Sequence, residues 1–274
     1  MAMYPDLKGK TAIITGGGKR AGLGFAMAVR LAQEGVNIVL ADLGDAQASP
    51  APTQEMQALA AELQGAGVQA LPLVCDMLDA AAVQAMVDTA VAHFGRIDIL
   101  VNNAGVGYLM KPIVEMTVQE WDTVLGVNLR GVFLATQAVA RHMIAHGGGG
   151  RIVNIASQAA KSGFPNASAY TASKHGLVGL TRVAAIELGK HRINVNAICP
   201  NHVTTGLGAW QNAYFAEQAG VSLDDYLAAM RSRIPLGRPG LQSDTANACA
   251  YLCSEQSQYM TGEAMNVSGG EEYH

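Results

Sequence analysis

Long hydrophobic runs are missing from this chain of 274 residues. No segment reaches the roughly 18 consecutive apolar residues that a membrane-spanning helix needs. The first ten residues are polar, so we expect neither a membrane span nor a secretory signal. Charged residues make up only 15% of the sequence, the formal net charge is -4, and no basic cluster is present. This composition argues against nucleic acid as a main partner.

Cysteine is also scarce, and its spacing is uninformative. Cys75, Cys199, Cys249 and Cys253 have neither the spacing of metal ligands nor that of a disulfide framework. Cys249 and Cys253 would share a helical face, but no set of histidines or carboxylates accompanies them, so we expect both in the core. We therefore expect no metal site and a reducing cytoplasmic location.

Apolar segments of strand length alternate with segments of helical periodicity almost from end to end. This alternation predicts a parallel sheet with helices on both faces, in one domain spanning residues 1–274. Strands are expected at 11–15, 37–41, 71–75, 97–101, 152–155, 193–198 and 264–267. Helices are expected at 23–34, 53–65, 80–94, 118–145 with an interruption near Asn128, 170–189 and 242–252. Residues 201–233 are predicted to be the least regular part, and residues 43–53 to form a surface loop.

Residues 157–174 give the strongest chemical signal. Tyr170 and Lys174 lie four residues apart at the start of a helical pattern, so both side chains would lie on one helix face. A cation lowers the pKa of a neighbouring phenol, which is near 10 when unperturbed. Ser157 follows the strand expected at 152–155 and would face this pair. The arrangement suits proton transfer to or from an alcohol, although a Tyr and a Lys on an ordinary amphipathic helix would give the same spacing.

A glycine-rich turn, from Thr15 to Gly24, separates the first strand from the first helix. Glycines at this place let the backbone approach a pyrophosphate bound at the helix N-terminus, or they serve packing alone. Asp42 ends the second strand about twenty residues later, where an acid accepts hydrogen bonds from the ribose hydroxyls of an adenosine. A helix cap or a turn acid is the alternative for Asp42.

Polar residues follow the third and fourth strands as well. Asp76 would accept a hydrogen bond from an adenine amino group or would form a turn. Residues 102–105 are Asn-Asn-Ala-Gly, and their small side chains would let the chain pass close to a ribose. Asn128 lies within a helical segment, where asparagine is unfavourable. It predicts a local kink that exposes a carbonyl or binds a water, unless it is a solvent-facing asparagine.

Over residues 9–270 this sequence resembles the short-chain dehydrogenase/reductase family. The resemblance implies an α/β fold with a single Rossmann-type doubly wound parallel sheet of about seven strands, in the order 3-2-1-4-5-6-7. It rests on the glycine-rich turn, Asn102, Asn103, Ala104, Gly105, Asn128, Ser157, Tyr170, Lys174, Pro200, Gly269 and Gly270.

The resemblance assigns roles to four catalytic residues. Tyr170 would be the general acid/base, and Ser157 would bind and polarise the substrate oxygen. Lys174 would bind the nicotinamide ribose and lower the pKa of Tyr170. Asn128 would complete a water-linked proton relay through Lys174.

The cofactor implied is NAD. Lys19 and Arg20 could pair with the 2'-phosphate of NADP, but the Asp42 carboxylate would repel that phosphate, and we expect the carboxylate to decide the choice. By resemblance, the backbone of Val203 and the hydroxyl of Thr205 would meet the nicotinamide carboxamide. The residues expected at the cofactor are Gly16, Gly18, Gly22, Leu23, Gly24, Asp42, Leu43, Asp76, Met77, Asn103, Ala104, Gly105, Tyr170, Lys174, Pro200, Val203 and Thr205.

The sequence departs from the family pattern in several places. Two extra residues stand between Gly16 and Gly22, and the loop at 43–53 is longer than usual. Asn201 and His202 follow the strand-six proline, where the family usually has glycine, and Ser268 stands where it often has aspartate.

The expected substrate is a secondary alcohol, diol or polyol, or the matching ketone. Gln158, Asn201 and His202 could bind a second hydroxyl, although a loop histidine often has no such role. Trp210 and Tyr214 would contact the substrate from a lid segment at 201–233, or would only pack within that segment. No charged side chain is predicted at the substrate end.

Two other functions remain open at this point: a reductase of 3-oxoacyl or other ketones that uses NADPH, and a non-catalytic dinucleotide sensor or scaffold. The presence of all four catalytic residues argues against the sensor. The helices near 117–141 and 169–188 have more apolar positions than one buried stripe requires. The resemblance implies that they pack against copies of themselves in a homotetramer.

Overall fold

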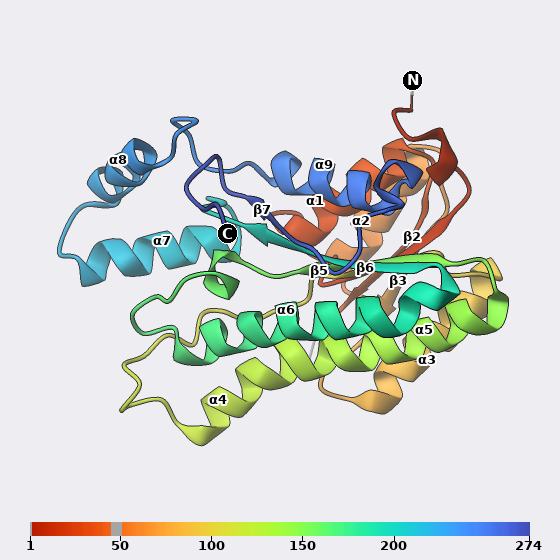
Figure 1. Cartoon of the computed structure of the whole chain (residues 1–274), viewed down its shortest axis with the longest axis horizontal. Coiled ribbons are helices and arrows are strands. Elements are labelled where there is room, and N and C mark those ends of the chain that lie inside the picture. The colour runs from red at the N-terminus through yellow and green to blue at the C-terminus, as the bar shows by residue number, and fades with distance from the viewer. Residues whose placement is uncertain (1, 45–50) are drawn as a thin grey trace.

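A parallel seven-stranded sheet forms the middle layer of the protein (Figure 1). The computed structural model describes residues 2–44 and 51–274, so that part of the loop expected at 43–53 lies outside the described residues. The strand order is β3-β2-β1-β4-β5-β6-β7, and every neighbouring pair is parallel. The predicted fold class and strand order are therefore confirmed. The strands are β1 (Thr11–Thr15), β2 (Asn37–Asp42), β3 (Ala70–Val74), β4 (Ile99–Asn102), β5 (Gly150–Ile155), β6 (Ile193–Pro200) and β7 (Ala264–Val267).

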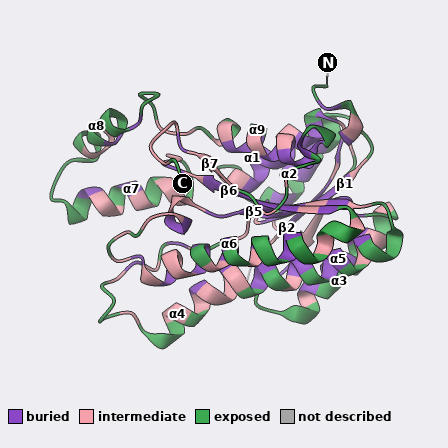
Figure 2. Ribbon diagram, in the orientation of Figure 1, coloured by how far each residue is buried: buried purple, intermediate pink, exposed green. Residues whose placement is uncertain are grey.

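Helices cover both faces of the sheet, because a parallel sheet must be buried on both sides. One face packs against α1 (Leu23–Gln33), α2 (Gln54–Gly65) and α9 (Gln242–Cys253). The other packs against α3 (Ala80–Phe94), α5 (Val132–His146) and α6 (Ser168–Leu188). Figure 2 shows the sheet and the inward helix faces as buried. Cys249 and Cys253 on α9 are fully buried in the first of these cores, as expected.

The helix starts follow local signals in the sequence. Thr53 caps α2, since its hydroxyl accepts a hydrogen bond from Met56 N at 3.2 Å. Asp79 caps α3 in the same way, through Ala81 N at 2.8 Å. A capping box of Thr117 and Glu120 begins α4 (Val118–Leu125). Short 3-10 turns occupy Pro5–Leu7, Gln158–Ala160, Gly189–His191 and Glu255–Ser257.

The helical segment around Asn128 is interrupted, as predicted. A π turn at Gly126–Gly131 joins α4 to α5, so that the whole segment Val118–His146 is helical. This segment is long and apolar enough to cross a membrane, yet half of its most apolar window is buried inside the protein. Its apolar character therefore serves packing against the sheet and α6, while Phe133 and Ile144 are left exposed.

Residues 201–233 were predicted to be the least regular part, and this is wrong. The structure has two helices there, α7 (Leu207–Gln218) and α8 (Leu223–Arg233), which project beyond the sheet (Figure 1). Neither has a strongly one-sided apolar pattern, because they pack mainly on each other and beside the cavity rather than on the sheet. Much of their surface is consequently exposed (Figure 2).

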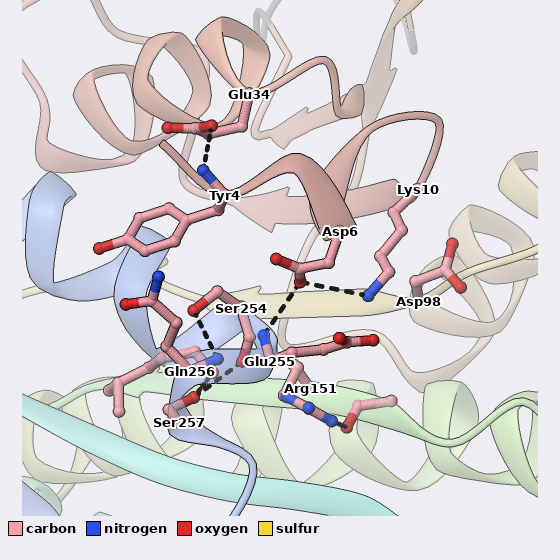
Figure 3. A network of polar contacts seen from close by, with 12 residues as sticks. Tyr4, Asp6, Lys10, Glu34, Asp98, Arg151, Ser254, Glu255, Gln256 and Ser257 are labelled. Carbon is pink, nitrogen blue, oxygen red and sulfur yellow. Dashed lines mark hydrogen bonds and ion pairs between the residues drawn. The ribbon is translucent and has the colours of Figure 1, made fainter. Parts of the chain in front are cut away.

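A polar network fastens the N-terminal segment to the rest of the fold (Figure 3). The Asp6 carboxylate accepts a hydrogen bond from Glu255 N at 2.9 Å. The Glu34 carboxylate is almost fully buried and accepts hydrogen bonds from Tyr4 N at 2.8 Å and from the Arg30 guanidinium at 2.5 Å. Burial opposes ionisation of Glu34, but these hydrogen bonds outweigh it and the pKa of Glu34 is lowered.

We predict that Glu34→Gln lowers the free energy of unfolding by about 1–3 kcal/mol at pH 7, since it removes hydrogen bonds to a buried charge. The folded-state pKa of Glu34 lies below its unfolded value of about 4.3, so its contribution is present above that value and is lost as the pH falls through the folded pKa. Urea unfolding at pH 7 and at about pH 3.5 should show the difference from the unmodified protein shrinking at the lower pH. Glu217→Gln, at an exposed position on α7, is the control. An equal difference at both pH values would contradict the prediction.

Candidate active site

A cavity of about 1100 Å³ runs along the edge of the sheet where the strands end. All seven strands are parallel, so their carboxyl ends meet at this edge, which is the usual ligand site of such sheets. Every residue predicted to contact the cofactor lines the cavity, with the exception of Gly18 and Gly24. This volume is slightly above the range of roughly 300–1000 Å³ that is common for drug-sized ligands. It therefore has room for a ligand as large as a dinucleotide.

Gly18 and Gly24 support the glycine-rich turn instead of lining the cavity. A Cβ on Gly24 would lie 2.3 Å from Gly16 O, and one on Gly18 would lie 2.7 Å from the Asp42 Cβ. Within the described residues, no side chain caps the start of α1 at Gly22, and its first turn has no acid. The free amide groups and the positive end of the helix dipole therefore suit a pyrophosphate.

Asp42 fixes the end of β2 beside this turn. Its Oδ2 accepts a hydrogen bond from Gly18 N at 2.7 Å, and its Oδ1 accepts one from Leu43 N at 2.8 Å. Each carboxylate oxygen has a second lone pair, so Asp42 can still accept hydrogen bonds from ribose hydroxyls. Supporting the turn and binding a ribose are thus compatible roles.

Asp76 and Asn103 hold the ends of the next two strands. Asp76 forms a turn, which was the alternative interpretation, because its Oδ1 accepts a hydrogen bond from Leu78 N at 2.8 Å. Asp76 also lines the cavity. The Asn103 amide donates to Thr15 O and Gly16 O, both at 2.9 Å, and so ties β4 to the glycine-rich turn.

Asn128 is completely buried and does not face solvent. Its side chain pairs with the backbone of Val106: Oδ1 accepts from Val106 N and Nδ2 donates to Val106 O, both at 2.8 Å. A Cβ on Gly105 would lie 3.2 Å from Asn128 Oδ1 and 3.8 Å from Lys174 Nζ. The π turn thus brings Asn128 close to Lys174, where the relay was predicted, although Asn128 itself does not line the cavity.

Tyr170, Lys174 and Ser157 come together as their spacing predicted. Tyr170 and Lys174 lie on one face in the first two turns of α6, with Lys174 Nζ 5.6 Å from the centroid of the Tyr170 ring. Lys174 Nζ donates a hydrogen bond to Ile155 O at 2.7 Å, at the end of β5. Ser157 follows two residues later, and its hydroxyl faces the Tyr170 phenol closely enough to favour the ionised form of the phenol and lower its pKa. A strand end and a helix start together position the three groups.

The pKa of Tyr170 is raised in this structure, whereas a lowered pKa was expected. Burial raises the pKa of Tyr170, and the nearby Ser157 hydroxyl opposes this only in part. Burial also lowers the pKa of Lys174 to about 8, so the cation is itself weakened. In the protein without its cofactor, burial therefore outweighs the groups that favour phenolate, and a lowering of the Tyr170 pKa by Lys174 together with a bound nicotinamide cation stays a prediction. Further positive charge in the cavity is needed to favour phenolate.

The substrate end contains charged residues, contrary to the expectation. Gln158, Asn201 and His202 line the cavity as predicted, but Arg233, Tyr226 and Glu271 line it too. Glu271 follows β7, so the rule that strand ends share one edge would have located it. No sequence signal would have located Arg233, because its place depends on how α8 packs.

Trp210 and Tyr214 lie outside the cavity lining, in contrast to the prediction that they contact the substrate. Their rings stack on each other with centroids 5.5 Å apart, and the Tyr214 hydroxyl accepts a hydrogen bond from Asn166. Phe215 and Gln211, on the neighbouring face of α7, line the cavity instead. Packing within the segment was the alternative interpretation, and the structure agrees with it.

Comparison with known proteins gives extensive matches. A family model described as enoyl-(acyl carrier protein) reductase matches residues 16–272. The chain is 39% identical to a 2-dehydro-3-deoxy-D-gluconate 5-dehydrogenase of Escherichia coli over 97% of this chain and 96% of that protein. It is 40% identical to a D-threitol dehydrogenase of Mycolicibacterium smegmatis over 96% and 93% of the two chains.

A solved structure of an NAD+-bound xylitol dehydrogenase superposes with a TM-score of 0.87 at 34% identity, covering 96% of this chain and 99% of that one. Since sequence and fold agree over nearly the whole length, the chain belongs to the short-chain dehydrogenase/reductase family of nicotinamide-dependent oxidoreductases.

Proposed function

We propose that this protein oxidises a secondary hydroxyl of a polyol to a ketone with NAD as the hydride acceptor. The observation that supports this most directly is the grouping of Ser157, Tyr170 and Lys174 beside a cavity of dinucleotide size. The names of the relatives point to hydroxyl-rich substrates, since they include a threitol and a xylitol dehydrogenase.

The reaction requires one proton acceptor in the protein. A nicotinamide held beside Tyr170 and Lys174 would supply the acceptor for the hydride of the carbinol carbon. Tyr170 takes the hydroxyl proton as phenolate, or returns it in the reverse direction, and Ser157 holds the substrate oxygen. The buried ammonium of Lys174, fixed on Ile155 O, stabilises that phenolate, while Asn128 keeps the loop after β4 in place beside it.

We predict that Tyr170→Phe lowers kcat by about a hundredfold or more, the usual effect of losing a general acid/base. NAD affinity, measured by fluorescence titration, should change little because the aromatic ring remains. Tyr251→Phe removes a phenol oxygen outside the cavity and is the control. A Tyr170→Phe protein that keeps most of its turnover would refute this mechanism.

The choice of cofactor depends on which charges at the adenosine end are already paired. Lys19 Nζ lies 3.4 Å from a Glu55 carboxylate oxygen, and the Arg20 guanidinium lies 2.7 Å from Glu62. These carboxylates of α2 compete with a 2'-phosphate for both cations. Asp42 would meet the same phosphate at the end of β2. At about 5 Å and an effective dielectric near 20, each pair of like unit charges costs roughly 3 kcal/mol before screening. An exposed ion pair contributes only about 0–1 kcal/mol.

We predict that NAD is preferred over NADP by at least about tenfold in kcat/KM, which corresponds to 1.4 kcal/mol. Asp42→Ala should reduce the preference, mainly by improving the use of NADP. Asp42→Asn removes the charge but keeps an acceptor for Gly18 N, so it separates repulsion from support of the turn. Asp76→Asn, at the strand end that would meet the adenine, should affect both cofactors alike. Equal or better use of NADP by the unmodified protein would show that Lys19 and Arg20 decide the choice.

We also propose that the protein assembles as a homotetramer through α4, α5 and α6. Phe133 and Ile144 on α5 and Val183 and Ile186 on α6 are exposed, although these helices already bury one face on the sheet. A second apolar face of this kind suits a symmetric interface between copies.

Sedimentation velocity at micromolar concentration should therefore give a tetramer. Ile186→Lys should shift the protein toward smaller species, because it places a charge in the proposed interface. Val221→Lys adds the same charge at an exposed apolar residue between α7 and α8 and should leave the tetramer intact. A monomer as the only species of the unmodified protein would contradict the proposal.

A further inference from the structure

We propose that Glu271 determines the substrate class: its carboxylate accepts hydrogen bonds from hydroxyls of an uncharged polyol, and its pairing with Arg233 disfavours substrates that carry a carboxylate. The inference rests on the proposed alcohol chemistry and adds the identity of the group that selects the substrate. Its basis is a charged cluster at the substrate end of the cavity.

A hydrogen-bonded turn after β7 places Glu271 in the lining of the cavity. Gly269 and Gly270 adopt positive φ values of 65° and 95°, which favour glycine. The Ser268 hydroxyl accepts hydrogen bonds from Gly270 N and Glu272 N, both at 3.3 Å, and so closes the turn. This gives Ser268 a structural role at the position where the family often has aspartate.

The next residue fastens this turn to the segment that follows the catalytic serine. Glu272 Oε1 accepts hydrogen bonds from Gln158 Nε2 at 2.8 Å and from Ser162 Oγ at 2.6 Å. Gln158 directly follows Ser157 in the chain, and both line the cavity. The segment that contains Glu271 is therefore attached next to the place where the reacting oxygen would bind.

Two side chains donate hydrogen bonds to the Glu271 carboxylate, and a third lies against it. Its Oε2 accepts a hydrogen bond from Asn201 Nδ2 at 2.8 Å, and its Oε1 accepts one from Arg233 Nε at 3.2 Å. His202 Nε2 lies 2.7 Å from Oε2. An ionised carboxylate has about four lone-pair sites, so acceptor capacity remains for a substrate hydroxyl.

His202 adds a second group suited to a hydroxyl. Burial lowers its pKa, and the opposing effect of Glu271 does not reverse this, so the imidazole is neutral at pH 7. Despite the short distance to Glu271, Nε2 is buried without a well-aligned hydrogen bond. The residue has a left-handed backbone, with φ of 46°, which is uncommon outside glycine and often accompanies functional sites. A hydroxyl can donate to Glu271 and, in the tautomer that carries the proton on Nε2, accept from this nitrogen.

The charged side chains at the substrate end of the cavity disfavour binding of a substrate that carries a carboxylate. Among the described residues that line the cavity, Arg233 is the cation at this end, and its Nε already donates to Glu271. Lys174 belongs to the reacting centre, and Lys19 lies at the glycine-rich turn. A substrate carboxylate would meet a guanidinium that is already paired and a carboxylate of its own sign. A row of hydroxyls can donate to Glu271 and accept from the remaining N–H groups of Arg233.

The test compares kcat/KM for xylitol, xylonate and 2-butanol, which differ in the group offered to Glu271. The unmodified protein should prefer xylitol to each of the others by tenfold or more. Glu271→Gln should lower the xylitol to 2-butanol ratio about tenfold, mainly through KM, and should raise the use of xylonate because Arg233 is released. Arg233→Gln should lower the use of xylonate. It provides a second test, at a side chain that is half-exposed.

Glu263→Gln removes the same charge at an exposed residue outside the cavity and should leave all three substrates unaffected. Equal or better use of xylonate by the unmodified protein would overturn the role of Glu271. So would a xylitol to 2-butanol ratio that Glu271→Gln does not change. Turnover of 2-butanol without any preference for xylitol would overturn this role alone and leave the alcohol chemistry intact. No turnover of any alcohol would overturn both.

Discussion

All strands of the sheet run in one direction, and the site depends on this constraint. Parallel pairing brings the carboxyl ends of the strands to one edge, so residues distant in the sequence meet there. Asp42 ends β2, Ser157 and Glu271 follow β5 and β7, and all three line one cavity. Helices on both faces bury the strands, which leaves this edge as the place where loops can form a site.

Buried polar groups place the chemistry at that edge. Lys174 is an almost fully buried cation whose pKa falls to about 8 because of burial, and its ammonium donates a hydrogen bond to Ile155 O. Asn128 satisfies its amide on the backbone of Val106 through a π turn, a feature that is rare and often marks functional sites. Residues of this kind weaken a core that would otherwise be apolar, and the protein retains them where a proton must move.

Pairing within the protein controls which charges a ligand can use. At the glycine-rich turn, Lys19 forms an ion pair with Glu55, and Arg20 forms one with Glu62. At the substrate end, Arg233 forms an ion pair with Glu271. In both places a cation near the cavity is already paired with a carboxylate, so its presence in the sequence does not predict an anionic ligand. The same principle connects the proposed preference for NAD with the proposed preference for uncharged polyols.

The order of the strands in the sheet was implied by the resemblance to the family. The sequence by itself determined most element boundaries within a few residues and the placing of Tyr170 and Lys174 on one helix face. Those features depend on short-range rules: apolar periodicity, helix caps and the spacing of i and i+4. Only the tertiary structure decided the direction of the Tyr170 pKa, the helices α7 and α8, the position of Trp210 outside the cavity and the Glu271–Arg233 pair. Arg233 and Glu271 are 38 positions apart, and they meet because α8 and the turn after β7 pack at the same edge of the sheet. Burial and long-range packing are properties of the folded chain, which no local pattern encodes.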